Sequence, residues 1–184
     1  NEDYRSFNLQ ILPPFSAGEQ GGMLTQIACI YHYHMILVAF FEMPEEKFPE
    51  YLPTQVSHGV VHMNYYTSRQ TGRQKLCYVY TPPAYETDLD RRFPVLYLQH
   101  GGGENETGWL WQGKLDWIAD NLLADGRMQD MIIVMNTGYA FRPDGSSHPA
   151  IGSFDEELTG DCVSFIDEQY RTLAQREYRS MAGL

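Results

Sequence analysis

Cysteine is scarce in this sequence, which has three: Cys29, Cys77 and Cys162. None belongs to a CxxC pair, and an odd number cannot all form disulfides with one another. The sequence therefore does not indicate a disulfide scaffold or a thiolate metal centre. Cys77 and Cys162 fall at core-facing positions of a predicted strand and a predicted helix, so we interpret them as buried small hydrophobic residues.

Positive charge is also in short supply. The 13 Lys and Arg residues stand against 24 Asp and Glu, for a formal net charge of -11, and the acidic residues are spread along the chain. Such a charge argues against nucleic acid or an anionic membrane surface as the partner. A neutral ligand is the better expectation.

No long uninterrupted hydrophobic run is present. The most apolar stretch, Met23 to Phe41, contains Gln26, His32 and His34, whose polar side chains are costly at the centre of a bilayer. We expect this stretch to form a pair of strands or a buried segment, and we expect no membrane partner. No part of the sequence resembles a signal peptide, and the start at Asn1 without a methionine predicts a processed product or a fragment.

Composition divides the chain into three parts. Hydrophobic residues make up 43% and aromatic residues 14%, which is enough for one substantial core. Residues 1–41 contain no motif that indicates chemistry and are left unassigned. Residues 42–55 are rich in Pro and Glu, a composition typical of an extended linker. Residues 56–184 carry a regular hydrophobic pattern and are predicted to form the main domain.

The pattern after residue 55 begins with a hairpin. Val60 to Tyr66 and Leu76 to Thr81 alternate in the period-2 manner of strands, with a polar turn at Thr71-Gly72 between them. Pro82-Pro83 ends the second strand. Val95 to Leu98 is then a short continuous apolar run, as expected of a strand buried on both faces.

Helices and strands then alternate to the end of the chain. Apolar residues at helical spacing predict a helix from Leu115 to Leu123, capped by Gly126, and Met131 to Met135 is the next buried strand. Ser153 and Glu156 form a capping-box pattern at the start of a helix that we expect to run to about Leu173. Tyr178 to Ala182 is the last predicted strand. This order predicts an α/β sheet with right-handed crossovers.

A glycine-rich turn, Gln99-His100-Gly101-Gly102-Gly103, follows directly on the strand that begins at Val95. Because glycine has no side chain, its backbone N–H groups can face a ligand without obstruction. An HGGG turn after a strand is one half of the oxyanion hole of lipases and esterases. The alternative is an ordinary glycine-rich connection. A phosphate-binding turn is disfavoured, because neither GxxxxGK(S/T) nor GxGxxG occurs.

The end of the chain carries a second indication of the same chemistry. The run from Arg179 to Leu184 places the first Gly and the variable residue of a GxSxG nucleophile elbow, Gly183-Leu184, at the end of a predicted strand. In that pattern a serine comes next. We therefore expect the nucleophile to follow Leu184.

These motifs resemble the feruloyl and acetyl xylan esterases of carbohydrate esterase family 1, within the wider group of enterochelin-esterase-like esterases. The resemblance extends from Glu42 to Leu184, and Phe41 to Glu45 looks like the linker that joins an N-terminal β-sandwich module to the esterase in multidomain members. The similar segments, in order and at family-like spacing, are Val56 to Gly59, Tyr78 to Pro83, Phe93 to Gly101, Asp120 to Leu122, Met131 to Val134 and Arg179 to Leu184.

The resemblance implies an α/β-hydrolase fold, of which this chain carries the N-terminal half of the sheet after a short segment and a linker. Such enzymes use a Ser, a His and a carboxylate, in which the Ser attacks the ester carbonyl, the His accepts its proton and the carboxylate orients the His. All three are expected after Leu184. The chain by itself is then expected to be inactive, and a homo-oligomer or a complementing C-terminal fragment is its expected partner.

Carried over to this sequence, the resemblance makes the turn at Gly101 and Gly102 the oxyanion half of the site, with the Gly102 N–H as donor. Gly103, Trp109 and Trp111 are the candidate substrate-binding residues, since an indole can stack on an aromatic acyl group or a sugar ring. At least one of the two tryptophans can equally be a core residue.

The histidines carry no catalytic prediction. His100 precedes the expected serine, whereas the triad His follows it in this fold, so we interpret His100 as a side chain that stabilises the turn. His58 and His62 are four residues apart, but Gly59 and the strand-like residues after it argue against a helix that would bring them to one metal ion. We expect no metal and no cofactor.

The predicted function is a secreted or periplasmic serine carboxylesterase that acts on acylated plant polysaccharide. The acyl group, feruloyl or acetyl, stays open, because acyl specificity is expected to lie in loops after the elbow. Two other classes also stay open. One is a non-catalytic carbohydrate-binding protein. The other is an acyltransferase of the same fold, similar to mycolyl transferases, which transfers the acyl group to a sugar hydroxyl.

Overall fold

The computed structural model describes residues 26–27, 40–41 and 49–183. The expectations for Cys29, His32 and His34, and for residues 42–48 of the linker, lie outside the described residues. Within the apolar stretch, β1 (Gln26–Ile27) pairs with β2 (Phe40–Phe41) in antiparallel register.

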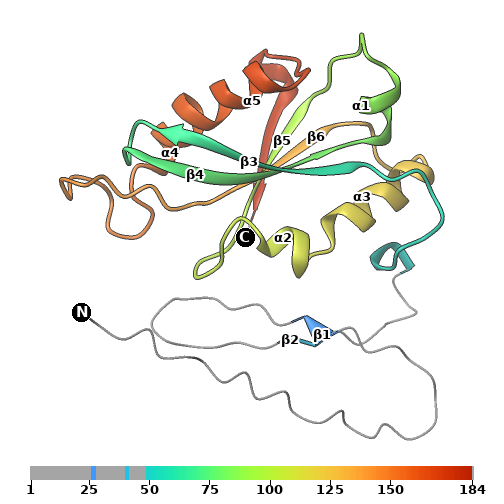
Figure 1. The fold of residues 1–184 in the computed structure, drawn as a ribbon, viewed down its shortest axis with the longest axis horizontal. Helices are drawn as coiled ribbons and strands as arrows, with labels where there is room; N and C mark the ends of the chain where they lie inside the picture. Colours follow the sequence, from blue (N-terminus) through green and yellow to red (C-terminus); the bar gives the residue numbers. More distant parts are fainter. Residues whose placement is uncertain (1–25, 28–39, 42–48, 184) are drawn as a thin grey trace, which may run out of the picture.

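The main body is a mixed sheet in the order β3-β4-β6-β5-β7 (Figure 1). β3 pairs with β4 and β4 with β6 in antiparallel register, whereas β5 pairs with β6 and with β7 in parallel. Every strand predicted from the main domain's sequence is present. The strands are β3 (Val60–Ser68), β4 (Arg73–Thr81), β5 (Val95–Gln99), β6 (Ile132–Asn136) and β7 (Arg179–Gly183).

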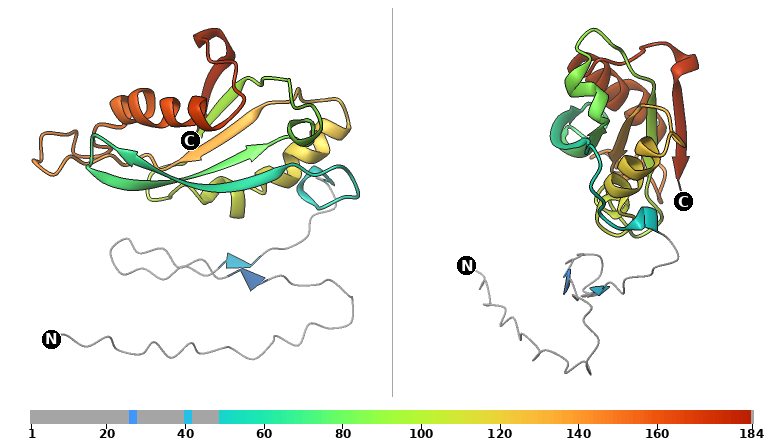
Figure 2. Two further views of the ribbon diagram at one scale, coloured as in Figure 1. Left: turned by 45° about the horizontal axis from the view of Figure 1, so that its top comes forward. Right: turned by 90° about the vertical axis from the view of Figure 1, so that its right-hand side faces the viewer.

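Helices cover both faces of this sheet. α4 and α5 lie on one face and α2 and α3 on the other (Figures 1 and 2). None of the helices within the described ranges is long and apolar enough to cross a membrane. The helices are η1 (Pro49–Tyr51), α1 (Pro83–Thr87), α2 (Gly108–Trp111), α3 (Leu115–Ala124), α4 (Phe154–Glu157), the π-helical turn η2 (Leu158–Cys162), α5 (Val163–Gln169) and η3 (Arg176–Tyr178).

Two hydrophobic clusters, one on each face, explain why the central strands are apolar throughout. Ile132 and Val134 of β6 belong to the cluster under α4, η2 and α5, whereas Ile133 and Met135 of the same strand belong to the cluster under α2 and α3. Successive side chains of a strand point to opposite faces, so a strand covered on both faces is apolar at every position. Cys77 and Cys162 are fully buried in the first cluster, as predicted.

The predicted helix begins directly after Ser153, as expected, but the capping box does not form and the helix ends before Leu173. The Ser153 side chain makes no capping hydrogen bond, and its backbone N–H instead donates to the Ala140 carbonyl at 2.7 Å. α5 ends at Gln169, because the following segment pairs with Phe93: the Phe93 N–H donates to the Arg171 carbonyl at 2.9 Å and the Leu173 N–H to the Phe93 carbonyl at 2.8 Å. Tertiary pairing thus overrides the helical pattern.

Two other predictions from local sequence patterns are confirmed by the structure. Gly126 has a φ of +65° and donates to the Leu123 carbonyl at 3.0 Å, which confirms the predicted glycine cap of α3. Pro82-Pro83 ends β4 as predicted, and Pro83 also begins the short helix α1, which the sequence pattern does not predict.

Residues 49–54 are attached to α3. The Asn121 side-chain amide donates to the carbonyls of Glu50 and Leu52, each at 2.9 Å, and the Tyr51 hydroxyl donates to the Gln112 carbonyl at 2.5 Å. The chain therefore enters the main body along α3 before it begins β3.

Candidate active site

The glycine-rich turn lies at the carboxyl edge of the parallel strands. It follows β5 directly, and the register of the sheet places Gly183 of β7 opposite Gln99, the last residue of β5. A Cβ on Gly183 would lie 2.5 Å from the Gln99 carbonyl oxygen, so the two strands approach closely enough here to require glycine. The end of β7 is therefore held beside the start of the turn.

The three glycines of the turn differ in what their N–H groups bind. The Gly101 N–H donates to Glu104 Oε2 at 3.2 Å, and the Gly103 N–H donates to the Tyr139 hydroxyl at 2.8 Å. Within the described part of the chain, the Gly102 N–H makes no such bond, and Gly102 is exposed. Of the three glycines of the turn, Gly102 is therefore the one whose N–H has no hydrogen-bond partner among the described residues.

His100 is buried beneath the turn and uses both of its ring nitrogens. Its Nδ1 lies 2.8 Å from the Gly101 carbonyl oxygen, which can only accept, and its Nε2 accepts from the Gly138 N–H at 2.9 Å. His100 therefore joins the turn to the loop after β6, in agreement with its predicted stabilising role.

Tyr139, which the sequence analysis did not select, completes the contacts of the turn. Its hydroxyl accepts the Gly103 bond, and its ring centroid lies 5.4 Å from that of His100 and 6.2 Å from that of Phe141. A signal was available: Tyr139 follows β6, which is parallel to β5, and loops after neighbouring parallel strands meet at one edge of the sheet.

The two candidate tryptophans occupy different environments. Trp109 is partly buried, packs against the cluster under α2 and α3, and donates from Nε1 to the Gln99 carbonyl at 2.9 Å. Trp111 is 42% exposed. The structure therefore places Trp109 at the base of the turn and leaves the ring of Trp111 accessible.

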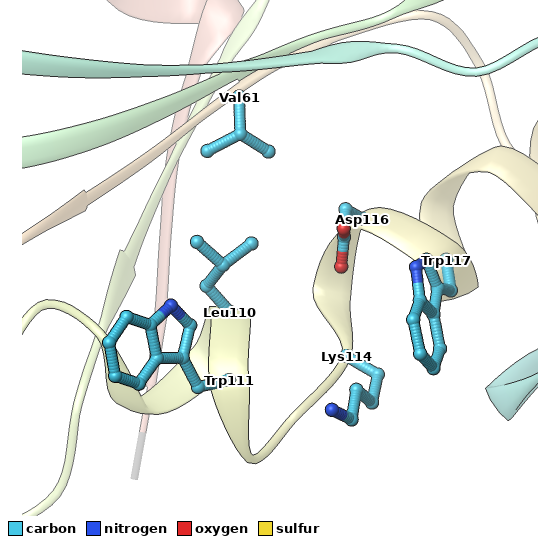
Figure 3. A pocket seen from close by; sticks show the side chains of 6 residues that line it. All are labelled: Val61, Leu110, Trp111, Lys114, Asp116 and Trp117. Carbon is cyan, nitrogen blue, oxygen red and sulfur yellow. The ribbon is translucent and has the colours of Figure 1, made fainter. Parts of the chain in front are cut away.

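Trp111 lines an open pocket of about 370 Å³ between β3, α2 and the start of α3 (Figure 3). Lys114 has a φ of 51°, and its ammonium lies 4.9 Å from the centroid of the Trp117 ring. Burial raises the pKa of the Asp116 carboxyl, and the neighbouring Asp120 acts in the same direction. The pocket is lined by Val61, Leu110, Trp111, Lys114, Asp116 and Trp117.

Three of the family-like segments meet at one buried carboxylate, Asp120. Its oxygens accept from the Gly59 N–H at 2.8 Å and the Tyr80 hydroxyl at 2.7 Å, and lie 2.8 Å from His58 Nδ1. These bonds tie α3 to β4 and to the segment before β3. The carboxylate is fully engaged, so we assign it a structural role.

The histidine pair at positions 58 and 62 is separated by these contacts. His62 Nε2 lies 3.0 Å from Thr81 Oγ1, whereas His58 turns toward Asp120. Among the described residues, no group of three or more His, Cys, Asp or Glu side chains is arranged to hold a metal ion.

Comparison with known proteins gives sequence relatives but no matching family model. A protein of Xylanibacter ruminicola named endo-1,4-beta-xylanase/feruloyl esterase is 37% identical over 134 residues. The match covers 70% of this chain but 18% of that relative. The chain thus spans about a fifth of the length of this curated relative.

Solved structures share the fold. A CE1 ferulic acid esterase from Anaeromyces mucronatus, in complex with ferulic acid, is 26% identical with a TM-score of 0.65, over 77% of this chain and 54% of that one. The feruloyl esterase module of Clostridium thermocellum, complexed with sinapinate, is 22% identical with a TM-score of 0.63, over 87% of this chain and 53% of that one. The predicted α/β-hydrolase fold is confirmed.

Replacement of Asp116 by Asn is expected to stabilise the protein at neutral pH. Because burial raises the pKa of this carboxyl, the folded protein binds its proton more tightly than the unfolded chain does. Stability from this group is therefore present at low pH and is lost as the pH rises through the folded pKa. The urea midpoint of Asp116→Asn should exceed that of the parent at about pH 7, and the difference should vanish at about pH 3.

Asp144→Asn is the matched control with the opposite sign. Hydrogen bonds from Ser146 lower the pKa of the Asp144 carboxyl, so this charge stabilises the folded state above the unfolded pKa and the effect is lost as the pH falls. Its replacement should lower the midpoint at neutral pH. A gain for Asp116→Asn that stays the same at both pH values would contradict the assignment.

Proposed function

We propose that this chain, a relative of the feruloyl esterases of carbohydrate esterase family 1, supplies the oxyanion half of the active site of a serine carboxylesterase that acts on acylated plant polysaccharide. The observation that carries the proposal is the free N–H of Gly102 at the carboxyl edge of the sheet, next to the end of β7. In esterases of this fold, that edge holds the nucleophile elbow.

The chemistry follows from this placement. A serine after Gly183-Leu184 would attack the ester carbonyl carbon, and the carbonyl oxygen would take up negative charge in the tetrahedral intermediate. The Gly102 N–H would donate to that oxygen, together with the N–H of the residue after the serine. Such a donor lowers the barrier because it is in place before the charge develops.

We place the serine, histidine and carboxylate of the triad after Leu184, so residues 1–184 alone would not turn over an ester. In this arrangement residues 56–183 form part of the esterase domain, residues 42–55 join it to the segment that precedes it, and residues 1–41 keep no assigned role.

For the substrate we propose an ester of a phenolic acid with a plant polysaccharide. Two of the solved neighbours are complexed with ferulic acid and with sinapinate, which favours an aromatic acyl group over acetyl. Gly103 and the ring of Trp109 border the turn, and the exposed ring of Trp111 offers a surface for a sugar or aromatic ring. Because such a polymer lies outside the cell, we propose a secreted or periplasmic protein.

Hydrolysis of methyl ferulate and p-nitrophenyl acetate by the protein that carries this sequence, measured together with its intact mass, tests the function. We expect turnover that phenylmethylsulfonyl fluoride abolishes, in a protein heavier than the 21.2 kDa of these residues. Robust inhibited turnover at about that mass would overturn the placement of the triad. Transfer of the acyl group to an added alcohol would instead indicate an acyltransferase, and glycan binding with no turnover would indicate a binding protein.

The role of the Gly102 N–H is tested by a pair of substitutions. Gly102→Pro removes the donor, so kcat for methyl ferulate is expected to fall by about 10²- to 10³-fold. Gly102→Ala keeps the N–H, and a Cβ at this position meets no atom within 4 Å, so its kcat should stay close to that of the parent. Equal losses in both variants, with native circular dichroism spectra, would count against the donor role.

A further inference from the structure

The proposed oxyanion turn, Gly101 to Gly103, is bound on one side by Tyr139. The Tyr139 hydroxyl accepts the Gly103 N–H bond at 2.8 Å. Gly103 has a φ of +84° and follows Gly102 directly. A turn of glycines has few side-chain contacts of its own to fix its conformation. The direction of the Gly102 N–H therefore depends on the contacts made on either side of it, by His100 and by Tyr139.

Tyr139 is in turn held by an ion pair whose carboxylate is fully buried. Lys75 of β4 donates from Nζ to the Tyr139 carbonyl oxygen, and the same Nζ lies 3.4 Å from Glu157 Oε1. Glu157 is fully buried and also accepts from the hydroxyls of Tyr66 and Ser68, each at 2.8 Å. Burial raises the pKa of the Tyr66 phenol, which keeps it protonated as a donor.

The rest of the loop that contains Tyr139 also leads back to α4, the helix that ends at Glu157. The Ala140 N–H donates to the Ile151 carbonyl at 3.0 Å, and the Ala140 carbonyl accepts from Ser153, which directly precedes α4. Glu157 is the last residue of α4. The loop from residue 137 to residue 153 thus returns to the helix whose end holds Lys75, so a displacement of that helix end would be passed to Tyr139.

Stability alone does not account for the charged pair. Removing a carboxylate and an ammonium from water is costly, and an apolar pair of similar volume is often as stable or more so. Here Lys75 reaches past Glu157 to the backbone of the residue that binds the turn. The Lys75–Glu157 ion pair therefore lies where it can fix the backbone of Tyr139 beside the glycine turn.

We propose that Tyr139 is a positioning residue of the oxyanion turn, and that the Lys75–Glu157 pair fixes Tyr139 so that the Gly102 N–H points toward the developing negative charge. This inference rests on the proposed function. It requires no contact between Tyr139 and the substrate, since Tyr139 acts through Gly103. Its loss should therefore lower kcat and leave KM unchanged.

Tyr139→Phe tests the first link, because it keeps the ring and removes the acceptor. Loss of one such bond should reduce kcat for methyl ferulate by about 2- to 12-fold, with KM unchanged. Amide hydrogen exchange at Gly103 should become faster in the same variant. Tyr65→Phe, at a residue 58% exposed on β3, is the matched control and should change neither quantity.

Lys75→Met and Lys75→Arg test the second link. Lys75→Met removes the donor to the Tyr139 carbonyl and should reproduce the loss of kcat and the faster Gly103 exchange, whereas Lys75→Arg keeps a donor and should restore both in part. Because Lys75→Met leaves Glu157 buried without its cation, Lys75→Met combined with Glu157→Gln serves as the variant without a buried charge. It should show the same kcat defect.

The outcomes separate this inference from the proposed function. A parent protein without esterase activity would overturn the function, and Gly103 exchange in Tyr139→Phe would still decide whether Tyr139 holds the turn. Unchanged kcat and unchanged exchange in Tyr139→Phe would overturn the positioning role while leaving the function intact. A rise in KM in place of a fall in kcat would also overturn it, because it would indicate direct contact with the substrate.

Discussion

Parallel pairing of β5 with β6 on one side and with β7 on the other is the interaction on which the candidate site depends. Strands that run in the same direction deliver the segments after them to one edge of the sheet. That pairing brings together the glycine turn after β5, the loop with Tyr139 after β6, and Gly183 at the end of β7. These segments are far apart in sequence, and the sheet register alone places them side by side.

Buried carboxylates hold elements of the fold together, whereas the glycine turn is contacted by Glu104, which accepts from the Gly101 N–H at 3.2 Å. Two of the buried carboxylates, Asp120 and Glu157, each accept several hydrogen bonds. Asp120 ties α3 to β4 and to the segment before β3, and Glu157 contacts Lys75, which binds the loop after β6. The turn itself presents backbone N–H groups. A neutral donor is suited to a charge that appears only during reaction, because it gains most from the charged state.

Sequence patterns predicted the helices and strands that are determined by neighbouring residues or by a hydrophobic pattern that repeats along the chain. Alternation identified the hairpin, the apolar run identified β5, and Gly126 identified the end of α3, since each follows from the chemistry of neighbouring residues. The end of α5 was missed because its cause is the pairing of Phe93 with residues about 80 positions later.

The same distinction applies to the site. The glycine turn after β5 was predicted, as a candidate oxyanion site, because glycines directly after a strand form a local motif. The contacts of Tyr139 and Lys75 form only when the sheet brings distant segments together. Tyr139 is 36 residues from Gly103 in sequence, and Lys75 is 64 residues from Tyr139. No local pattern distinguishes them from other residues of a loop and a strand.

The most direct test of the account is the structure of the protein that carries this sequence after inhibition by a phosphonate ester that mimics the tetrahedral intermediate. We predict a phosphonyl oxygen about 2.7–3.1 Å from the Gly102 nitrogen, with the Gly103 N–H still bound to the Tyr139 hydroxyl. An oxygen bound instead by Gly101 or Gly103, or by none of the three glycines, would contradict the account.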